Sequence, residues 1–323
     1  MNFRLIVGTV VAILAFAGNS VLCRLALEQG TIDPASFTTV RLLSGALMLC
    51  VLLVSIPKLM LQKTEFADKT AAEPEAILNN AGVGLYKTSA NPDAFFANLG
   101  RLFALEKSTW SGGLALFFYA TGFSFSYITL PAGTGALILF AAVQITMLSH
   151  ALIQGSRFSF AQWFGFAMAL IGLVYLFLPG ITAPPIFGAL LMVIAGVAWG
   201  IYCILGKRVT NPTQSTAENF IRASIITAPL SLVFINSMSV SATGLMFAII
   251  SGAMTSGIGY AIWYAVLPEL KAASSASLQL TVPVIATVGG VIWLGEEVSI
   301  RLALASIIIL GGVAMVVLLT KRE

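Results

Sequence analysis

The feature that most constrains this sequence is a succession of apolar stretches, each long enough to cross a lipid bilayer as a helix. A spanning helix needs roughly 20 apolar residues, because hydrocarbon offers no water to bond its backbone. The composition agrees, since 58% of the residues are hydrophobic and 9% are charged. The sequence therefore predicts an all-α membrane protein. Its ten predicted transmembrane helices are 4–26, 35–56, 110–129, 132–153, 161–178, 184–205, 218–236, 243–266, 273–294 and 301–320.

The distribution of Lys and Arg predicts how these helices are oriented. Cytoplasmic segments of membrane proteins carry an excess of both residues. With the N-terminus inside, thirteen of the 17 Lys and Arg residues fall in cytoplasmic segments, six of them in the loop 57–109. We therefore predict a multi-pass protein of the cytoplasmic (inner) membrane with both termini in the cytoplasm. This topology accounts for the net charge of +4, so the predicted partner is the lipid bilayer and not a nucleic acid.

Internal similarity divides the chain in two. Asn19 and Arg41 precede Gly200 and Arg222 by the same 181 positions, and further similarities follow in the same order. The alternative is chance similarity, since apolar helices share few residue types. The similar segments are Ala17-Gly18-Asn19 with Ala198-Trp199-Gly200, Tyr127–Pro131 with Tyr264–Pro268, and 155–159 with 295–299.

We interpret the chain as two five-helix repeats, residues 1–178 and 179–323, with the loop 57–109 inserted in the first. An odd number of spans inserts the second repeat upside down, an arrangement typical of secondary transporters. Ala15-Phe16-Ala17 would also suit a cleavable signal peptide. However, the apolar run continues to Leu27, and the first repeat requires this helix.

Several short motifs, in this order and spacing, resemble the drug/metabolite transporter superfamily in its EamA-like ten-helix branch. The resemblance implies a carrier with a central cavity, lined mainly by spans 1, 3, 4, 6, 8 and 9, that exports amino acids, related metabolites or toxic compounds. Val143 and Ser156 depart from it, since they replace a proline and an acid that the second half retains as Pro283 and Glu296. The motifs are Asn19, Asp33-Pro34 followed by Arg41, Gly133-Thr134-Gly135-Ala136-Leu137, the helix of Pro283, and Gly295-Glu296-Glu297 leading into Gly311-Gly312.

Polar side chains inside the spans are the first candidates for substrate contact. Asn19, Gln144 and Gln279 can each donate and accept hydrogen bonds, as a zwitterionic or hydroxylated solute requires. The alternative is that these amides tie helices together. Pro283 removes a backbone donor and leaves the carbonyl of Gln279 without its usual helical partner, which would either bind solute or only bend the helix.

Aromatic side chains at helical spacing are the second group of candidates. Trp199, Tyr202 and Tyr260 lie within spans and would form the wall of a cavity for an amphipathic or aromatic solute. Tyr119 and Tyr127 stand two helical turns apart on one face. Helix packing and interface anchoring are the alternative roles.

Three charged residues are candidates for gating or structural roles. Arg41 and Arg222 occupy equivalent repeat positions within spans, where each would either snorkel to the interface or pair with a carboxylate. A structural role is favoured for both, with substrate contact as the alternative. Glu218 lies one turn before Arg222, whereas Asp33 or Glu28 would have to reach Arg41 from the preceding loop. Glu296 precedes the last span, so we expect it to cap that helix, with a gating role as the alternative.

These observations predict a secondary transporter that exports a small metabolite, such as an amino acid or a related amphipathic compound, by alternating access. A flippase for a lipid-linked substrate and a membrane sensor or scaffold that uses the loop 57–109 are the alternatives. The sequence contains no recognisable nucleophile, metal-binding or acid-base motif, so we expect no enzyme, catalytic residue, metal or cofactor. It leaves open whether the chain forms a homodimer.

Overall fold

The computed structural model describes residues 3–67, 110–155, 157–180, 183–206, 212–266, 270 and 278–319. Its regular elements in these ranges are all helical. The α-helices are α1 (Phe3–Glu28), α2 (Pro34–Ala67), α5 (Trp110–Ser126), α6 (Ala132–Ile153), α7 (Phe160–Phe177), α8 (Ile186–Gly206), α9 (Pro212–Val233), α10 (Ala242–Ile249), α11 (Gly259–Val266), α13 (Val282–Gly289) and α14 (Ile300–Leu318).

Three shorter helical segments complete these elements. A single 3-10 turn, η2 (Ile235–Ser237), follows α9. The π-helix η3 (Ile250–Ile258) joins α10 to α11 into one continuous rod, and a second π-helix, η5 (Gly290–Leu294), extends α13. Wide helical turns of this kind are frequent at functional sites.

The predicted spans coincide with helices. Within the described part of the chain, seven helices are long and apolar enough to cross a membrane: α1, α2 as far as Ser55, α6, α7, α8, the α10–η3–α11 rod and α14. The other three predicted spans fall on α5, which has 17 residues, on the more polar α9, and on the short apolar stretch Val282–Leu294. The prediction of an all-helical membrane protein is therefore confirmed among these residues.

Two helix boundaries differ from the prediction. Helix α2 continues to Ala67, so the first residues assigned to the loop 57–109 are helical, and residues 68–109 lie outside the described residues. Helix α13 begins only at Val282, and Pro283 lies in its first turn. A proline there removes no hydrogen bond within α13. Residues 278 and 279 before it are helical and residues 280 and 281 form a turn, so the predicted helix 273–294 is interrupted next to Pro283.

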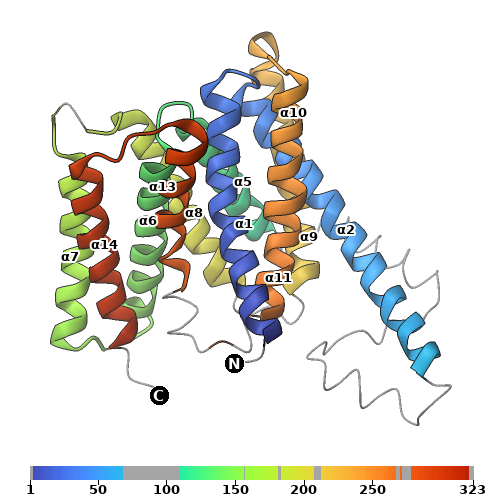
Figure 1. Cartoon of the computed structure of the whole chain (residues 1–323), viewed down its shortest axis with the longest axis horizontal. Helices are drawn as coiled ribbons and strands as arrows, with labels where there is room; N and C mark the ends of the chain where they lie inside the picture. Colours follow the sequence, from blue (N-terminus) through green and yellow to red (C-terminus); the bar gives the residue numbers. More distant parts are fainter. Residues whose placement is uncertain are drawn as a thin grey trace.

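Helices from the two halves of the chain pack against each other in the core of the bundle, and one helix pair lies at its edge. Helix α5 packs against α8 and α9, whereas the α10–η3–α11 rod packs against α1 and α2. Helices α2 and α9 pack against each other, as do α6 and α13. At one edge of the bundle α7 lies beside α14 (Figure 1). Gly165 and Gly312 face each other there so closely that a Cβ atom on Gly165 would lie 2.6 Å from the Gly312 carbonyl oxygen.

The two ends of the bundle differ. Helix α1 begins and α14 ends at the same end (Figure 1). At the opposite end, the connection after α1 bonds to the one before α10: the Asp33 amide donates to the Ser239 carbonyl at 2.8 Å, and the Ser241 amide donates to the Thr31 carbonyl at 2.8 Å. Segments more than 200 positions apart are therefore joined through their backbones.

Candidate functional site

Arg41 lies at the centre of a buried polar region. Its side chain leaves α2, and the residue is 1% exposed. Nη2 donates to the Tyr119 hydroxyl at 3.0 Å, and Nε donates to Ser256 Oγ at 3.3 Å. Its Cζ lies 5.2 Å from the Tyr119 ring centroid and 4.8 Å from that of Phe123, so aromatic faces attract the cation. Helices α2 and α5 and the π-helix η3 together hold this guanidinium.

Small residues on η3 allow this arrangement. Gly252 lies against α2, where a Cβ atom would overlap the Ser44 hydroxyl and the Arg41 carbonyl oxygen. Because Gly252 has no side chain, η3 approaches the α2 backbone closely enough for Ser256, one helical turn further on, to reach the guanidinium. The glycine therefore positions a hydrogen-bond acceptor for Arg41.

Asn19 extends the polar region from α1. The residue is 4% exposed, and its Nδ2 donates to the Tyr119 hydroxyl at 3.4 Å. Its Oδ1 accepts from Ser251 Oγ at 2.6 Å and from Thr255 Oγ1 at 3.4 Å. A connected series of hydrogen bonds thus runs from the guanidinium through Tyr119 to Asn19 and the hydroxyls of η3.

Aromatic rings border this polar region. The Trp199 ring on α8 lies 4.7 Å from the Tyr119 ring, 5.1 Å from the Tyr260 ring, and 5.2 Å from the Tyr202 ring, on which it stacks. Tyr202 and Tyr260 are each 3% exposed. The polar and aromatic residues together form what we call the central cluster: Asn19, Arg41, Tyr119, Phe123, Trp199, Tyr202, Ser251, Thr255, Ser256 and Tyr260.

The other predicted substrate contacts lie apart from this hydrogen-bonded series. Gln144 is buried on α6, where its amide makes no hydrogen bond to any described residue. Gln279 is partly buried just before α13, and Pro283 is buried in the first turn of that helix. Within the described chain, none of the three shares a hydrogen bond with the central cluster.

One predicted charge pair forms and the other does not. Arg222 donates to Glu218 Oε2 from Nη1 at 3.3 Å and from Nη2 at 3.4 Å, as predicted. The predicted acidic partners of Arg41 are wrong. Asp33 instead accepts from the amides of Ser36 and Ser239, and Glu28 pairs with Arg24, because the Arg41 side chain points into the bundle and away from the loop.

Glu296 caps a different helix from the one predicted. Its Oε1 and Oε2 accept from the Ala132 amide in the first turn of α6 at 3.0 and 2.8 Å, whereas Ser299 caps α14. Arg24 donates to Glu296 Oε1 at 3.2 Å and to the carbonyls of Tyr127 and Ile128, both at 3.0 Å. We call this contact between Arg24, Glu296 and Ala132 the end lock. Ser156, the first-half counterpart of Glu296, lies outside the described residues.

Burial raises the pKa of the Glu296 carboxyl above its ordinary value. The Ala132 amide and the Arg24 guanidinium act in the opposite direction, but the loss of solvent is the larger effect. Keeping the ionised Glu296 carboxylate in this partly buried position therefore costs electrostatic free energy.

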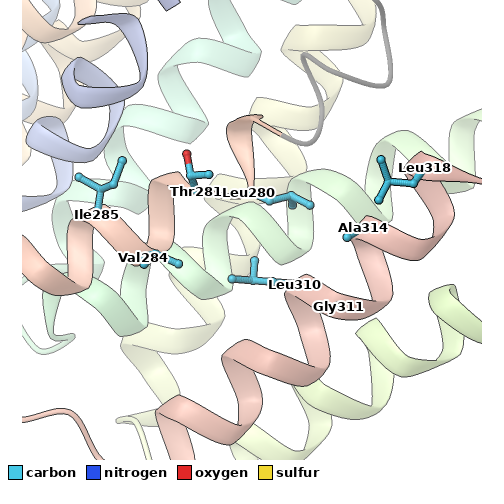
Figure 2. Close-up of a pocket in the computed structure, with 8 residues that line it drawn as sticks. All are labelled: Leu280, Thr281, Val284, Ile285, Leu310, Gly311, Ala314 and Leu318. Atoms are coloured by element: carbon cyan, nitrogen blue, oxygen red, sulfur yellow. The ribbon is translucent and has the colours of Figure 1, made fainter. Parts of the chain in front are cut away.

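A groove of about 490 Å³ lies apart from the central cluster, between α13 and α14 (Figure 2). Its only hydroxyl, on Thr281, already donates to the Leu278 carbonyl at 2.6 Å. The groove therefore offers little to orient a polar solute, and we do not assign it as the substrate site. Its lining residues are Leu280, Thr281, Val284, Ile285, Leu310, Gly311, Ala314 and Leu318.

Sequence reasoning missed several residues that the structure brings to these sites. Ser251, Thr255 and Ser256 were not selected, because hydroxyls on a small-residue face are ordinary in packed membrane helices. Arg24 is no candidate from the sequence either, because a basic residue near the end of a predicted span commonly reaches the membrane interface. In the sequence, the one indication of these polar contacts is Tyr119, which begins the aromatic series that continues to Tyr127.

Comparisons with known proteins identify the fold and the family. The model of the EamA-like transporter family matches residues 186–318. An uncharacterized protein of Pseudomonas aeruginosa is 42% identical over 313 residues, which are 97% of this chain and 94% of that protein. A solved structure, 20% identical, covers 98% of this chain and 99% of its own with a TM-score of 0.60, which shows the fold alone.

More distant relatives carry functional names. A probable terminal-alkyne amino-acid exporter of Streptantibioticus cattleyicolor is 29% identical over 65% of this chain and 71% of that protein. A probable amino-acid metabolite efflux pump of Salmonella typhimurium is 24% identical over 62% of this chain and 73% of that protein. The family and these names indicate a transporter rather than an enzyme. With its apolar helices and its nearly full-length relative, the chain therefore belongs to the EamA-like transporter family of the drug/metabolite transporter superfamily, as a multi-pass membrane transporter of small molecules.

Proposed function

We propose that this protein is a secondary transporter of the cytoplasmic membrane that exports an amino acid or a related amphipathic metabolite by alternating access. Both termini face the cytoplasm in this proposal, and the solute binds at the central cluster. The observation that carries it is the origin of the cluster. Asn19, Arg41 and Tyr119 come from the first predicted repeat, and Trp199 and Tyr260 come from the second.

A site built from both halves is what alternating access requires. When two bundles rock against each other, a solute held between them meets first one side of the membrane and then the other. The central cluster has the mixed character that such a solute needs, with amide, hydroxyl and guanidinium groups beside aromatic faces. The exporter and efflux-pump names of the relatives agree with this substrate class.

Helix packing supports the two proposed repeats, 1–178 and 179–323. If each half is exchanged for the other, the contact of α5 with α8 corresponds to that of the α10–η3–α11 rod with α1. The contacts of α2 with α9 and of α7 with α14 correspond to themselves. The family match at 186–318 also begins with α8 and ends with α14, as a five-helix unit would.

The end lock supplies a closed gate for this cycle. Arg24 and Glu296 join α1 to the connection before α14, and Glu296 also holds the start of α6. In the proposed topology this is the outer end of the bundle. The structure then represents a state closed toward the outside, and export requires the Arg24–Glu296 contact to break.

The direct test measures export from cells that overproduce the protein, with Trp199→Ala and Tyr260→Ala as variants. We expect the medium of wild-type cells to be enriched in particular metabolites, and both variants to lose most of that enrichment because the cluster loses an aromatic wall. Trp163→Ala is the matched control, since Trp163 lies on α7 and is 50% exposed at the outside of the bundle.

Membrane abundance must be equal in all strains, as judged by immunoblot. Equal enrichment by wild type, Trp199→Ala and Tyr260→Ala would place the solute site elsewhere. Absence of any enrichment by the wild type would contradict the export function itself.

A further inference from the structure

Arg41 is a buried cation that has no acidic partner among the described residues. Each acidic residue whose side chain the structure describes lies elsewhere: Glu28 and Glu296 pair with Arg24, Asp33 lies in the connection after α1, Glu218 pairs with Arg222, and Glu297 is exposed. In addition, Nη1 of Arg41 is buried and has no hydrogen-bond partner in the described part of the chain. Arg222, which occupies the equivalent position in the second predicted repeat, has its acidic partner in Glu218.

The surroundings of Arg41 offset only part of this charge. Tyr119 and Ser256 accept one hydrogen bond each, and the rings of Tyr119 and Phe123 attract the cation. Neither ring provides an acceptor for Nη1. An unpaired charge at membrane depth is costly, and such groups face a partner or a functional cavity. The described residues therefore leave the positive charge of Arg41 without a negatively charged partner.

We infer that Arg41 is the recognition residue for a carboxylate on the transported solute. This inference rests on the proposed function and specifies its substrate class. A carboxylate is the planar, two-oxygen anion that matches the fork of guanidinium donors. Its single negative charge balances the single positive charge of Arg41, the one described cation in the central cluster. Arg41 would neutralise only half the charge of a doubly charged phosphate.

The rest of the central cluster suits the remainder of such a solute. The Ser251 and Thr255 hydroxyls donate in their hydrogen bonds to Asn19, so their oxygens keep lone pairs that can accept from an ammonium or hydroxyl group. The faces of Trp199 and Tyr260 provide an apolar wall for a hydrocarbon side chain. Monocarboxylates with a polar substituent, zwitterionic amino acids among them, carry this combination of groups.

The test profiles the medium of cells that overproduce wild type, Arg41→Gln, Arg41→Lys or Arg222→Gln, by untargeted mass spectrometry at matched membrane abundance. We expect every compound enriched by the wild type to carry a carboxylate. Arg41→Gln should reduce that enrichment at least about tenfold, the scale of a lost charge-assisted hydrogen bond, and Arg41→Lys should retain part of it. Arg222→Gln should keep the same set of exported compounds.

Thermal melting of the purified proteins separates recognition from a structural role. The wild type should be stabilised by the exported compound and not by its neutral amide, while Arg41→Gln responds to neither. Removal of an unpaired cation should leave the melting temperature of ligand-free Arg41→Gln unchanged or raise it. Arg222→Gln should melt at a lower temperature, because it removes the cation that pairs with the largely buried Glu218 carboxylate.

The outcomes distinguish this inference from the proposed function. If the wild type enriches no compound, the transport proposal fails regardless of Arg41. If it exports compounds without a carboxylate, or if Arg41→Gln exports as well as the wild type, the carboxylate inference fails and transport stands. Equal destabilisation of Arg41→Gln and Arg222→Gln, with an unchanged response to the acid over the amide, would make Arg41 a structural residue.

Discussion

Individual residues show where sequence reasoning succeeds and where it stops. Asn19, Trp199, Tyr202 and Tyr260 were predicted because polar and aromatic groups at membrane depth are selective features, and the structure brings all four together. The partner of Arg41 was mispredicted, since the sequence search considered nearby acids. One of its two acceptors, Ser256, lies 215 positions further along the chain, and only the packing of η3 on α2 reveals it.

Glu296 provides a pH prediction at this scale. Because burial raises its pKa, the folded protein binds this proton more tightly than the unfolded chain does. The free energy of unfolding therefore falls as the pH rises through the interval between the ordinary carboxyl pKa and the raised one. We expect the melting temperature of the purified wild type to decline over that interval, and Glu296→Gln to lack that part of the decline. Glu297→Gln, which changes an exposed neighbour, should keep the wild-type slope.

The same carboxylate has a measurable capping role. Glu296→Ala removes the acceptor of the Ala132 amide and leaves Arg24 without its cross-bundle partner. We expect a loss of about 1–2 kcal/mol in the free energy of unfolding, as for other lost helix caps. Glu296→Gln should lose less, because its amide oxygen still accepts from Ala132. Chemical denaturation in detergent compares the two, and equal losses would contradict the capping role.

At the scale of elements, hydropathy located each helix but not its detailed form. Apolar runs predict where a helix crosses the membrane, and most of the predicted spans begin and end within a few residues of the ends of a helix. They do not predict the π-helices η3 and η5 or the extension of α2 to Ala67. These features depend on packing partners and backbone geometry, to which composition is insensitive.

The approach of η3 to α2 gives an element-scale prediction. Gly252→Ala would force the two helices apart at Arg41, so we expect a loss of about 1–3 kcal/mol in stability, as is typical for overpacking, together with loss of export. Gly311→Ala on α14 is the matched control, because a Cβ atom there meets no atom within 4 Å. It should be neutral or stabilise by roughly 0.5–1 kcal/mol. Equal melting temperatures for the two variants would refute this account of η3.

At the scale of the whole molecule, the proposed topology makes a prediction for accessibility labelling. Arg157 and Ser239 are both exposed, in connections that follow α6 and precede α10. In a background without Cys23, Cys50 and Cys203, a membrane-impermeant thiol reagent applied to intact cells should label Ser239→Cys and not Arg157→Cys. Disruption of the cells should expose both. Labelling of both variants in intact cells, or of Arg157→Cys alone, would overturn the orientation and the positive-inside argument with it.

The contacts that close one end of the bundle affect the kinetics of transport. Opening toward the outside would break the end lock and the backbone contacts of Asp33 and Ser241. This cost makes the outward-open state a minor one, so a solute that arrives from outside meets a binding-competent protein only part of the time. Its apparent affinity from that side falls in proportion to that fraction, although the binding groups are the same. A carrier without an energy source must keep Vmax/KM equal in both directions, so the outer face would show both the higher KM and the higher Vmax. Such a carrier binds its solute with higher apparent affinity from the cytoplasm than from outside.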